Sequence, residues 1–171
     1  TTNVLADSDS KSVRYWIYTP GEGSGMWDKF YNEGIMAIGW AEIGDLRAFG
    51  SKKAMKLRMK ETYDPSLTYM NAAHATWQFA NEIKVGDVVF VKKGRTQIIG
   101  RGIVTSEYEY LESDTSYPHR RTVNWTHKGE WPHPSGQAVL KTLTDVTPYT
   151  DYVEKLCALF TADTDDDVEE Q

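Results

Sequence analysis

Aromatic side chains beside turns, mixed with lysine and arginine, are the residues of this sequence best suited to chemistry. The stretch GIMAIGWAEIGDL, residues 34–46, places Trp40 between an apolar run and an acidic turn. A second ring, Tyr117, stands just before HRRTVNW. Aromatic rings stack on nucleobases with about 1–3 kcal/mol per base, and cationic side chains bind phosphate. This combination predicts a nucleic-acid site that stacks a base.

The cations expected to contact phosphate lie on two segments. They are Lys92, Lys93 and Arg95 around the KKGR turn, and Arg120 and Arg121 after Tyr117. The alternative is that these charges only form a solvated surface. The glycine-rich stretch GEGSG, residues 21–25, lies between an expected strand and an expected helix. Its backbone N–H groups could hold a phosphate, although a plain turn is the more ordinary interpretation.

Catalytic and metal-binding signatures are absent from the sequence. The four histidines, at positions 74, 119, 127 and 133, lack close metal-ligand spacing. A single Cys157 excludes a disulfide framework and a cysteine zinc site, and its place in an apolar helical pattern predicts core packing. No G-x-S-x-G, Walker A or dinucleotide motif occurs. The sequence therefore predicts neither an enzyme nor a cofactor or metal.

The negative charge of the chain is concentrated at its ends. The net charge is −6, yet residues 163–171 hold six acids and no base. Residues 1–12 carry −1, so residues 13–160 carry +1. A nearly neutral body can present a basic face to a polyanion. Without a signal peptide or an apolar run near twenty residues, we expect a cytoplasmic protein that does not engage a membrane.

The periodicity of apolar residues and the turn signals predict one α+β domain, a small twisted β-barrel or sheet with flanking helices. Strands are expected at 13–19, 35–40, 119–131 and 139–147, and residues 84–110 are expected to form a turn, a strand, a hairpin, a strand, a glycine break and a further strand. Helices are expected at 26–34 (ended by Gly34), around 51–62, at 65–83 and at 151–160.

Not every aromatic residue is expected to bind a ligand. Trp16, Trp77 and Trp125 lie within strands or on the apolar face of a helix, so we expect them in the core. On the helix at 65–83, the face toward the core is expected to include Met70, Ala73, Trp77 and Ala80. Residues 1–12 and 161–171 are polar or acidic and are expected to be disordered.

Three ordered blocks carry a resemblance to a known family. WIYTPGEGSGMWDKFYNEGIMAIGWAEIGDL, WQFANEIKVGDVVFVKKGRTQIIGRGIVTSEYEY and YPHRRTVNW resemble the EVE-type modified-base readers of the PUA superfamily, which are related to YTH domains. More specifically, they are similar to the readers at the N-termini of McrB-like restriction proteins. The resemblance covers residues 13–160.

The resemblance implies a base flipped into an aromatic cage. Trp40 stands where the first cage residue of a YTH domain follows the second strand, and Tyr117 stands where a second precedes a V-x-W strand. Tyrosine here replaces the tryptophan usual in that family. Further base-binding residues expected on this basis are Tyr18, Trp27 and Tyr108, and Ser24 joins the five cations as an expected contact to the nucleic-acid backbone.

The function implied by the resemblance is binding of DNA that contains a modified base, as the recognition module of a modification-dependent restriction system in a prokaryote. An AAA+ GTPase or ATPase motor and a nuclease subunit would then be its partners. Two alternatives stay open: an RNA-binding PUA-like domain, and a protein-interaction module whose aromatic residues are all core. The sequence does not decide between DNA and RNA, because contacts to the 2′-OH make that distinction.

Overall fold

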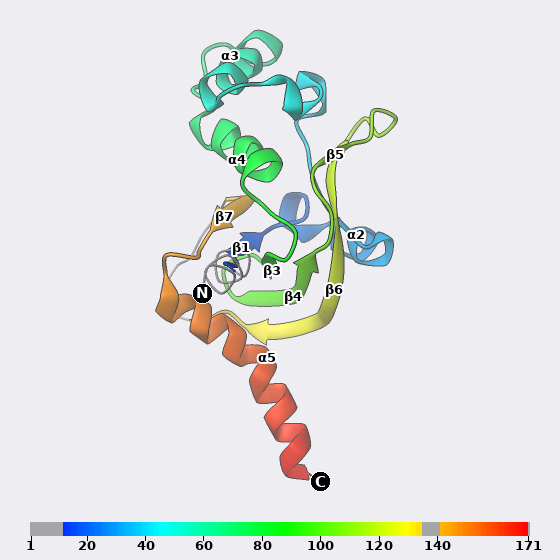
Figure 1. The fold of residues 1–171 in the computed structure, drawn as a ribbon, viewed down its shortest axis with the longest axis vertical. Coiled ribbons are helices and arrows are strands. Elements are labelled where there is room, and N and C mark those ends of the chain that lie inside the picture. The colour runs from blue at the N-terminus through cyan, green and yellow to red at the C-terminus, as the bar shows by residue number, and fades with distance from the viewer. Residues whose placement is uncertain (1–11, 135–140, 171) are drawn as a thin grey trace, which may run out of the picture.

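A curled β-sheet forms the body of the domain, with helices packed on both of its faces (Figure 1). This computed structural model describes residues 12–134 and 141–170, with side chains up to Thr161. The strand order is β2-β6-β4-β3-β1-β7, with β5 paired to β6. Only β1 and β3 run parallel among the described pairs. The strands are β1 (Tyr15–Tyr18), β2 (Ile35–Ile38), β3 (Val88–Lys93), β4 (Gln97–Val104), β5 (Glu109–Tyr110), β6 (His119–Pro132) and β7 (Leu143–Asp145). The predicted fold class is confirmed.

The helices begin and end at local signals in the sequence. Ser51 caps α3, its hydroxyl accepting a hydrogen bond from the backbone N–H of Ala54. Gly34 ends α2 in the left-handed conformation (φ 68°), as the sequence predicts. The helices are α2 (Trp27–Glu33), α3 (Lys52–Thr62), α4 (Met70–Asn81) and α5 (Thr150–Glu170), with short 3-10 turns η1 (Glu22–Ser24), η2 (Ala41–Ile43) and η3 (Leu46–Ala48).

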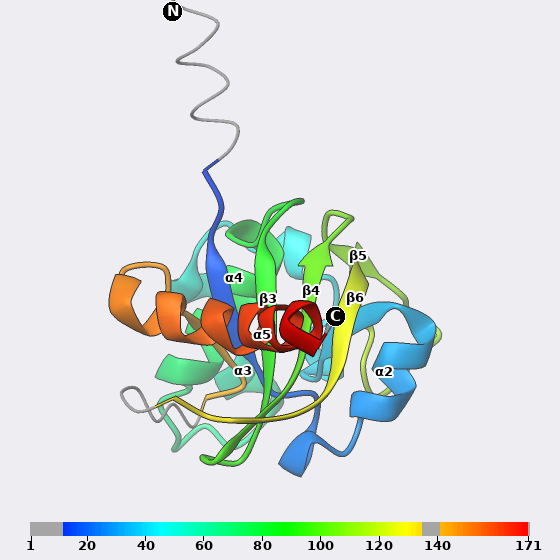
Figure 2. The same ribbon diagram turned by 90° about the horizontal axis from the view of Figure 1, so that it is seen from below.

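The central strands are buried on both faces, because one face packs against a larger hydrophobic core and the other against a smaller one. Trp16 and Tyr18 of β1 face the larger core, which also contains residues of α2, α3 and α4. Ile17 of β1 and Phe90 of β3 face the smaller core beneath α5, where Leu156 also packs. Seen from below, α5 lies across β3 and β4 (Figure 2). The predicted core position of Trp16 is confirmed.

The sheet curls where β4 pairs with the long strand β6. The register shifts between Ile98 and Gly100 and again between Arg101 and Gly102, and such bulges bend a strand. A Cβ atom at Gly100 would lie 2.3 Å from the Trp27 ring, so only glycine fits there. The prediction that residues 97–104 break into two strands at a glycine is wrong. Strand β4 continues through Gly100 and Gly102, which leave space for the rings of Trp27 and Trp125.

Helix α4 differs from its prediction in both start and orientation. The expected helix begins at 65, whereas α4 begins at Met70, because residues 64–69 form a turn in which Asp64 accepts hydrogen bonds from Ser66. The buried face contains Ala73, Thr76 and Phe79. Met70 is 67% exposed, so its predicted position toward the core is wrong.

The structure describes little of the expected N-terminal tail but most of the expected C-terminal tail. Residues 1–11 of the expected N-terminal tail lie outside the described residues. Helix α5 continues to Glu170, through most of the segment expected to be disordered from 161 (Figure 1). That segment contains no glycine or proline, so no local signal ends the helix at 160.

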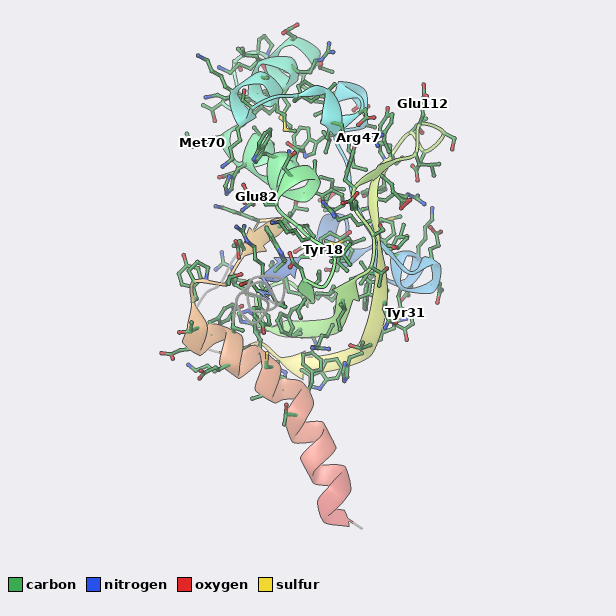
Figure 3. All side chains as sticks on the ribbon, viewed as in Figure 1. Tyr18, Tyr31, Arg47, Met70, Glu82 and Glu112 are labelled. Carbon is green, nitrogen blue, oxygen red and sulfur yellow. The ribbon has the colours of Figure 1, made fainter. Side chains whose placement is uncertain are left out.

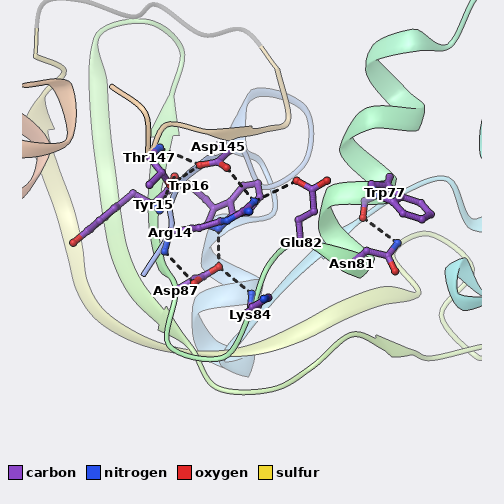
Figure 4. Close-up of polar contacts among 10 residues, drawn as sticks. All are labelled: Arg14, Tyr15, Trp16, Trp77, Asn81, Glu82, Lys84, Asp87, Asp145 and Thr147. Carbon is purple, nitrogen blue, oxygen red and sulfur yellow. Dashed lines mark hydrogen bonds and ion pairs between the residues drawn. The ribbon is translucent and has the colours of Figure 1, made fainter. Parts of the chain in front are cut away.

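A buried carboxylate joins β1 to the turn before β3 (Figure 4). Asp87 accepts hydrogen bonds from the Trp16 indole at 3.0 Å, the Lys84 backbone N–H at 2.9 Å and the Arg14 backbone N–H at 3.2 Å. The Arg14 guanidinium then pairs with Glu82 and Asp145. Because these contacts satisfy a charge that would otherwise be costly to bury, the Gly-Asp turn holds β1 and β3 in register.

Candidate nucleic-acid interface

Trp40 and Tyr117, which are far apart in the sequence, line one pocket of about 500 Å³. Trp40 follows the end of β2, and Tyr117 precedes β6, which pairs with β2. Tyr63, at the end of α3, and Glu42 of η2 also line this hollow, which we call the aromatic pocket. Its volume lies in the range of about 300–1,000 Å³ that is usual for small-ligand sites.

The backbone at Trp40 is held in an unusual conformation. Its φ of 64° lies in the left-handed region, which costs a non-glycine residue on the order of 1–3 kcal/mol. The buried His119 supports this conformation through its Nε2, 3.1 Å from the Trp40 carbonyl oxygen. Since a carbonyl only accepts, Nε2 carries the proton, and Nδ1 of the neutral ring then accepts from the Tyr108 hydroxyl at 2.7 Å.

This relay ends at the backbone of η3. The Tyr108 hydroxyl oxygen accepts a hydrogen bond from the Leu46 N–H at 3.0 Å. Burial lowers the pKa of His119, although the Trp40 carbonyl and the charge of Asp45 favour the protonated ring. The neutral form is therefore the one that fits the relay at neutral pH. Strand β6 thus fixes the residue that carries the principal ring of the aromatic pocket.

Two tyrosines pack on the edge of the Trp40 ring. The centroids of Trp40 and Tyr63 are 5.4 Å apart at 73°, and those of Trp40 and Tyr69 are 6.1 Å apart at 88°. The Tyr63 hydroxyl donates to the Glu42 carboxylate at 2.6 Å, and this hydrogen bond is the main cause that lowers the pKa of Glu42. The aromatic pocket therefore contains an ionised acceptor beside a fixed indole ring.

The opposite side of the aromatic pocket is formed by the loop before β6. Phe30 of α2 packs against the Tyr117 ring, with centroids 5.4 Å apart at 81°. Asp114 accepts from the backbone N–H groups of Tyr117 and Ser116, which closes the loop. A Cβ atom at Gly21 would lie 3.1 Å from the Tyr117 hydroxyl, so η1 also approaches this ring closely.

The outer edge of β2 lies beside the aromatic pocket and is engaged by Tyr18. The Tyr18 hydroxyl accepts from the Ala37 N–H at 2.9 Å and donates to the Ala37 carbonyl at 2.5 Å, so these groups face away from β6. Alternate residues of a strand direct their N–H and C=O groups to the same edge. Gly39, which follows β2, also lines the aromatic pocket.

Tyr18 and Tyr108 support the aromatic pocket but do not line it. Tyr18 is fully buried inside the curl of the sheet (Figure 3), and burial raises its pKa. Tyr108 is buried in the relay to His119. Both hydroxyls are engaged by the protein itself. This placement contradicts direct base binding by either residue and assigns them to holding β2 and Trp40 in place.

A second hollow, of about 440 Å³, contains three other predicted residues: Ser24, Trp27 and Lys93. Trp27 is 5% exposed and packs against Trp125 with centroids 4.7 Å apart. The Ser24 hydroxyl is buried and donates to the Lys92 carbonyl at 2.6 Å. The structure therefore separates these residues from the aromatic pocket, and it contradicts a shared base cage for Trp27 and Trp40.

The predicted phosphate contacts are divided between the interior and the surface. The Arg121 guanidinium is buried and donates to the carbonyls of Phe79, Ala80 and Ser106, so phosphate binding by Arg121 is contradicted. Lys92 is also buried, its ammonium group 3.4 Å from the Gly94 carbonyl, which does not support a phosphate contact. Arg120 pairs with Asp114 at 3.2 Å, whereas Lys93 and Arg95 are exposed around the β3–β4 turn.

Sequence reasoning missed Tyr63, Tyr69 and Glu42. The two tyrosines flank the loop between α3 and α4 in ETYDPSLTYM, one at each helix end. Two aromatic residues at facing helix ends could have indicated a site. Their contact with Trp40, however, depends on how the α3–α4 pair packs on the sheet. Glu42 gave no signal beyond being one acid of the turn after Trp40.

Comparison with known proteins identifies the family. A family model described as a domain of unknown function, DUF8426, matches residues 16–150. The chain belongs to this DUF8426 family. No curated protein matches. Residues 16–150 include every residue that lines the aromatic pocket, so this site lies wholly within the DUF8426 domain.

Two solved structures are similar to this DUF8426 domain. One is titled "YTH domain-containing protein mmi1 and RNA complex", with 12% identity, a TM-score of 0.47, and coverage of 87% of this chain and 82% of that one. The other is titled "Mmi1 YTH domain", with 13% identity, a TM-score of 0.49, and coverage of 91% and 79%. At these scores the similarity carries no information about the residues of the site.

Two further properties concern the described part of the chain. No helix there is both long and apolar enough to cross a membrane. The same residues contain no group of three or more histidine, cysteine or acidic side chains placed to hold a metal ion.

Proposed function

We propose that this domain binds nucleic acid by taking one base into the aromatic pocket, and that its target is a modified base of DNA. The observation that carries the proposal is the convergence of Trp40 and Tyr117 on one pocket of about 500 Å³. Rings that enclose a base replace part of the stacking that the base loses when it leaves a duplex, which costs a few kcal/mol.

The fixed position of Trp40 supports binding rather than core packing. Strained backbone is maintained where the surrounding structure over-determines it, and it occurs often at ligand sites. Here the His119 relay holds the backbone, while the Trp40 ring lines the aromatic pocket. A domain whose aromatic residues were all core, as in a simple protein-interaction module, would have no need of this arrangement. The pocket therefore favours a base reader.

The acceptor groups favour bases with an exocyclic amino group. Glu42 is ionised at neutral pH and lies at the aromatic pocket, and carboxylates accept hydrogen bonds from the amino group of cytosine. The same chemistry serves the amino group of adenine. A methyl group adds only about 0.8 kcal/mol of apolar contact, so the polar groups must supply much of the selectivity. Methylated cytosine and adenine are accordingly the proposed targets.

The biological setting follows from the resemblance to McrB-like readers. In that setting the domain recognises modified DNA for a restriction system of a prokaryote, with an AAA+ motor and a nuclease subunit as partners. The domain itself binds and does not catalyse. RNA is the alternative ligand, because an aromatic pocket accepts a base whichever sugar it carries.

The test is a binding panel by fluorescence anisotropy. Duplexes carry 5-methylcytosine, 5-hydroxymethylcytosine, N4-methylcytosine, N6-methyladenine or no modification, and single-stranded RNA with and without N6-methyladenine forms the other arm. The proposal predicts tighter binding to at least one modified duplex than to its unmodified match. If the domain prefers RNA, then RNA and not DNA is its ligand. If it binds modified and unmodified nucleic acids equally, or binds none of them, the proposal is overturned.

Variants of Trp40 assign the effect to the aromatic pocket. Trp40→Ala should weaken binding to the preferred duplex by about 5- to 150-fold, which corresponds to the loss of about 1–3 kcal/mol of stacking. Trp40→Gly removes the same ring and also relieves the positive φ, so it guards against a misfolded alanine variant. Trp77→Ala is the control, because Trp77 is a half-buried ring on α4 that does not line the aromatic pocket. Unchanged selectivity in both Trp40 variants would contradict the assignment.

A further inference from the structure

A groove with a basic rim runs between α3 and α4. Lys52, Lys53 and Lys56 of α3 and Met70, Asn71 and His74 of α4 line it, and its volume is about 530 Å³. We call it the lysine groove. Met70, which is labelled between the two helices in Figure 3, supplies an exposed apolar surface there.

A smaller hollow of about 330 Å³ lies between the aromatic pocket and the lysine groove and shares lining residues with each. Trp40 and Thr142 line both this hollow and the aromatic pocket, and Asn71 lines both the hollow and the lysine groove. Lys141 also lines the hollow. The hollow and the lysine groove lie on different faces of α4 and meet at Asn71, so a chain seated in the aromatic pocket would pass Trp40 and then the N-terminal turn of α4 to reach α3.

The charges along this path have one sign. No acidic residue lines either the hollow or the lysine groove. In the part of the chain that the structure describes, none of Lys52, Lys53, Lys56 and Lys141 forms an ion pair. Partial burial, and then the charge of Lys52, lowers the pKa of His74; Glu82 acts in the opposite direction, and Lys141 has a smaller lowering effect. His74 therefore lies within electrostatic reach of both ends of the cationic path.

The helix geometry explains why these lysines share a face. At 100° per residue, Lys52 and Lys56 lie about 40° apart on α3, next to the buried face formed by Met55 and Met59. Arg58 lies on the other flank of that buried face. An exposed cationic rim above an apolar floor suits a nucleic-acid strand, whose phosphates seek cations and whose sugars and bases offer apolar surface.

We propose that the lysine groove binds the DNA strand next to the base held in the aromatic pocket, with Lys52, Lys53 and Lys56 contacting its phosphates. This inference rests on the proposed function and deepens it. It moves the electrostatic part of the interface from the β3–β4 turn and the start of β6, where the sequence predicts it, to α3. Because phosphate contacts carry no base information, the lysine groove contributes affinity, while the aromatic pocket contributes selectivity.

The decisive comparison is Lys56→Gln against Arg58→Gln. Each variant removes one positive charge from α3, two residues apart, so net charge and helix context are matched. Binding to a modified and an unmodified duplex is measured from about 50 to 200 mM salt. Lys56→Gln should weaken both duplexes equally and flatten the slope of log K against log salt by about 0.7–0.9, whereas Arg58→Gln should match wild type.

A triple variant and a second control extend the range of the test. Lys52→Gln/Lys53→Gln/Lys56→Gln should flatten the slope by about 2–3 and leave the ratio of modified to unmodified affinity unchanged. Lys93→Gln/Arg95→Gln removes two exposed charges near the β3–β4 turn and should have a smaller effect. If the Lys93/Arg95 variant flattens the slope and the α3 variants do not, the inference is overturned.

Failure of the inference and failure of the proposed function give different results. If wild type prefers modified DNA, Trp40→Ala abolishes the preference and all α3 variants behave as wild type, only the lysine groove is refuted. If Lys56→Gln changes the affinity for modified DNA alone, Lys56 contacts the base and not a phosphate, which also overturns the inference. If wild type binds none of the nucleic acids at about 50 mM salt, both proposals fall together.

Discussion

Replacing the buried Arg121 by lysine should destabilise the domain. It should leave the phosphate contacts of the domain unchanged. Arg121 is 2% exposed and lies on β6 beside the C-terminal end of α4. Its guanidinium donates to the Phe79 carbonyl at 2.8 Å, the Ala80 carbonyl at 3.2 Å and the Ser106 carbonyl at 3.1 Å. Two of these carbonyls belong to the last turn of α4, which lacks partners within the helix.

The expected magnitude follows from these three bonds. A hydrogen bond to a charged group contributes about 1.5–3 kcal/mol, and a carbonyl left buried without a partner adds a penalty. Lysine keeps the charge but has a single ammonium group, so it cannot reproduce a planar fork that reaches three carbonyls on two segments. With two of the three bonds lost, the free energy of unfolding should fall by about 3–5 kcal/mol. That is a fifth or more of the roughly 5–15 kcal/mol of stability of a typical small domain.

Urea unfolding, followed by tryptophan fluorescence, measures this loss. The midpoint should fall with the m-value unchanged, because the surface exposed on unfolding stays the same. Arg120→Lys is the matched control: it is the neighbouring arginine, it is partly exposed and it pairs with Asp114, so its replacement should cost no more than about 1 kcal/mol. Burial lowers the pKa of Arg121 to about 10, which leaves the guanidinium charged at neutral pH in the wild type.

Two results would refute this reasoning. One is a free energy of unfolding within about 0.5 kcal/mol of wild type, which would show that the three carbonyls do not depend on the guanidinium. The other is a salt slope of DNA binding flattened by about 0.9 in an Arg121→Gln protein below its unfolding transition, because only the loss of the charge tests a phosphate contact, and this result would return Arg121 to the phosphate contacts.

Two further predictions concern the support of Trp40 and the curl of the sheet. Because burial lowers the pKa of His119 in the folded state, its contribution to stability is complete above the unfolded pKa of about 6.5 and is lost as the pH falls toward the folded value. Urea unfolding from pH 7.5 to 5 should therefore show a steeper loss for wild type than for His119→Gln, which does not titrate; parallel curves would exclude His119 as the cause. Gly100→Ala should destabilise the domain by about 1–3 kcal/mol, because its Cβ would lie 2.3 Å from Trp27; a Tm equal to that of wild type would show that the ring moves aside freely.

The elements with strong local signals could be predicted from the sequence. Gly34 ends its helix as expected, the helix expected around 51–62 forms as α3, and the β3–β4 hairpin forms around its KKGR turn. These features depend on a few neighbouring residues. The extent of β4 depends on Trp27 instead, because the space that Gly100 provides is filled by a ring from a distant helix. Contacts between residues so far apart in the sequence cannot be predicted from a local sequence pattern.

The burial of Arg121 next to Arg120 could have been predicted from the sequence. Successive side chains of a strand point to opposite faces, so two adjacent arginines within one strand do not both face solvent. In β6 the buried residues are His119, Arg121 and Val123, in alternation with partly exposed ones. The alternation alone would have placed Arg121 with Val123 on the inner face. Its carbonyl partners on α4 and after β4 could not have been found without the tertiary structure.

The polar atoms of three framework rings are engaged within the protein, whereas those of the two rings at the aromatic pocket are not. Tyr18, Tyr108 and Trp16 each engage theirs within the protein, on Ala37, on His119 with Leu46, and on Asp87. In the part of the chain that the structure describes, neither the Trp40 indole N–H nor the Tyr117 hydroxyl makes a hydrogen bond, and both residues line the aromatic pocket. Leaving a buried polar atom unpaired is costly, and the Trp27 indole N–H, buried without a partner, is the exception among these core rings. A base entering the aromatic pocket would meet the Trp40 and Tyr117 rings with their polar atoms still available.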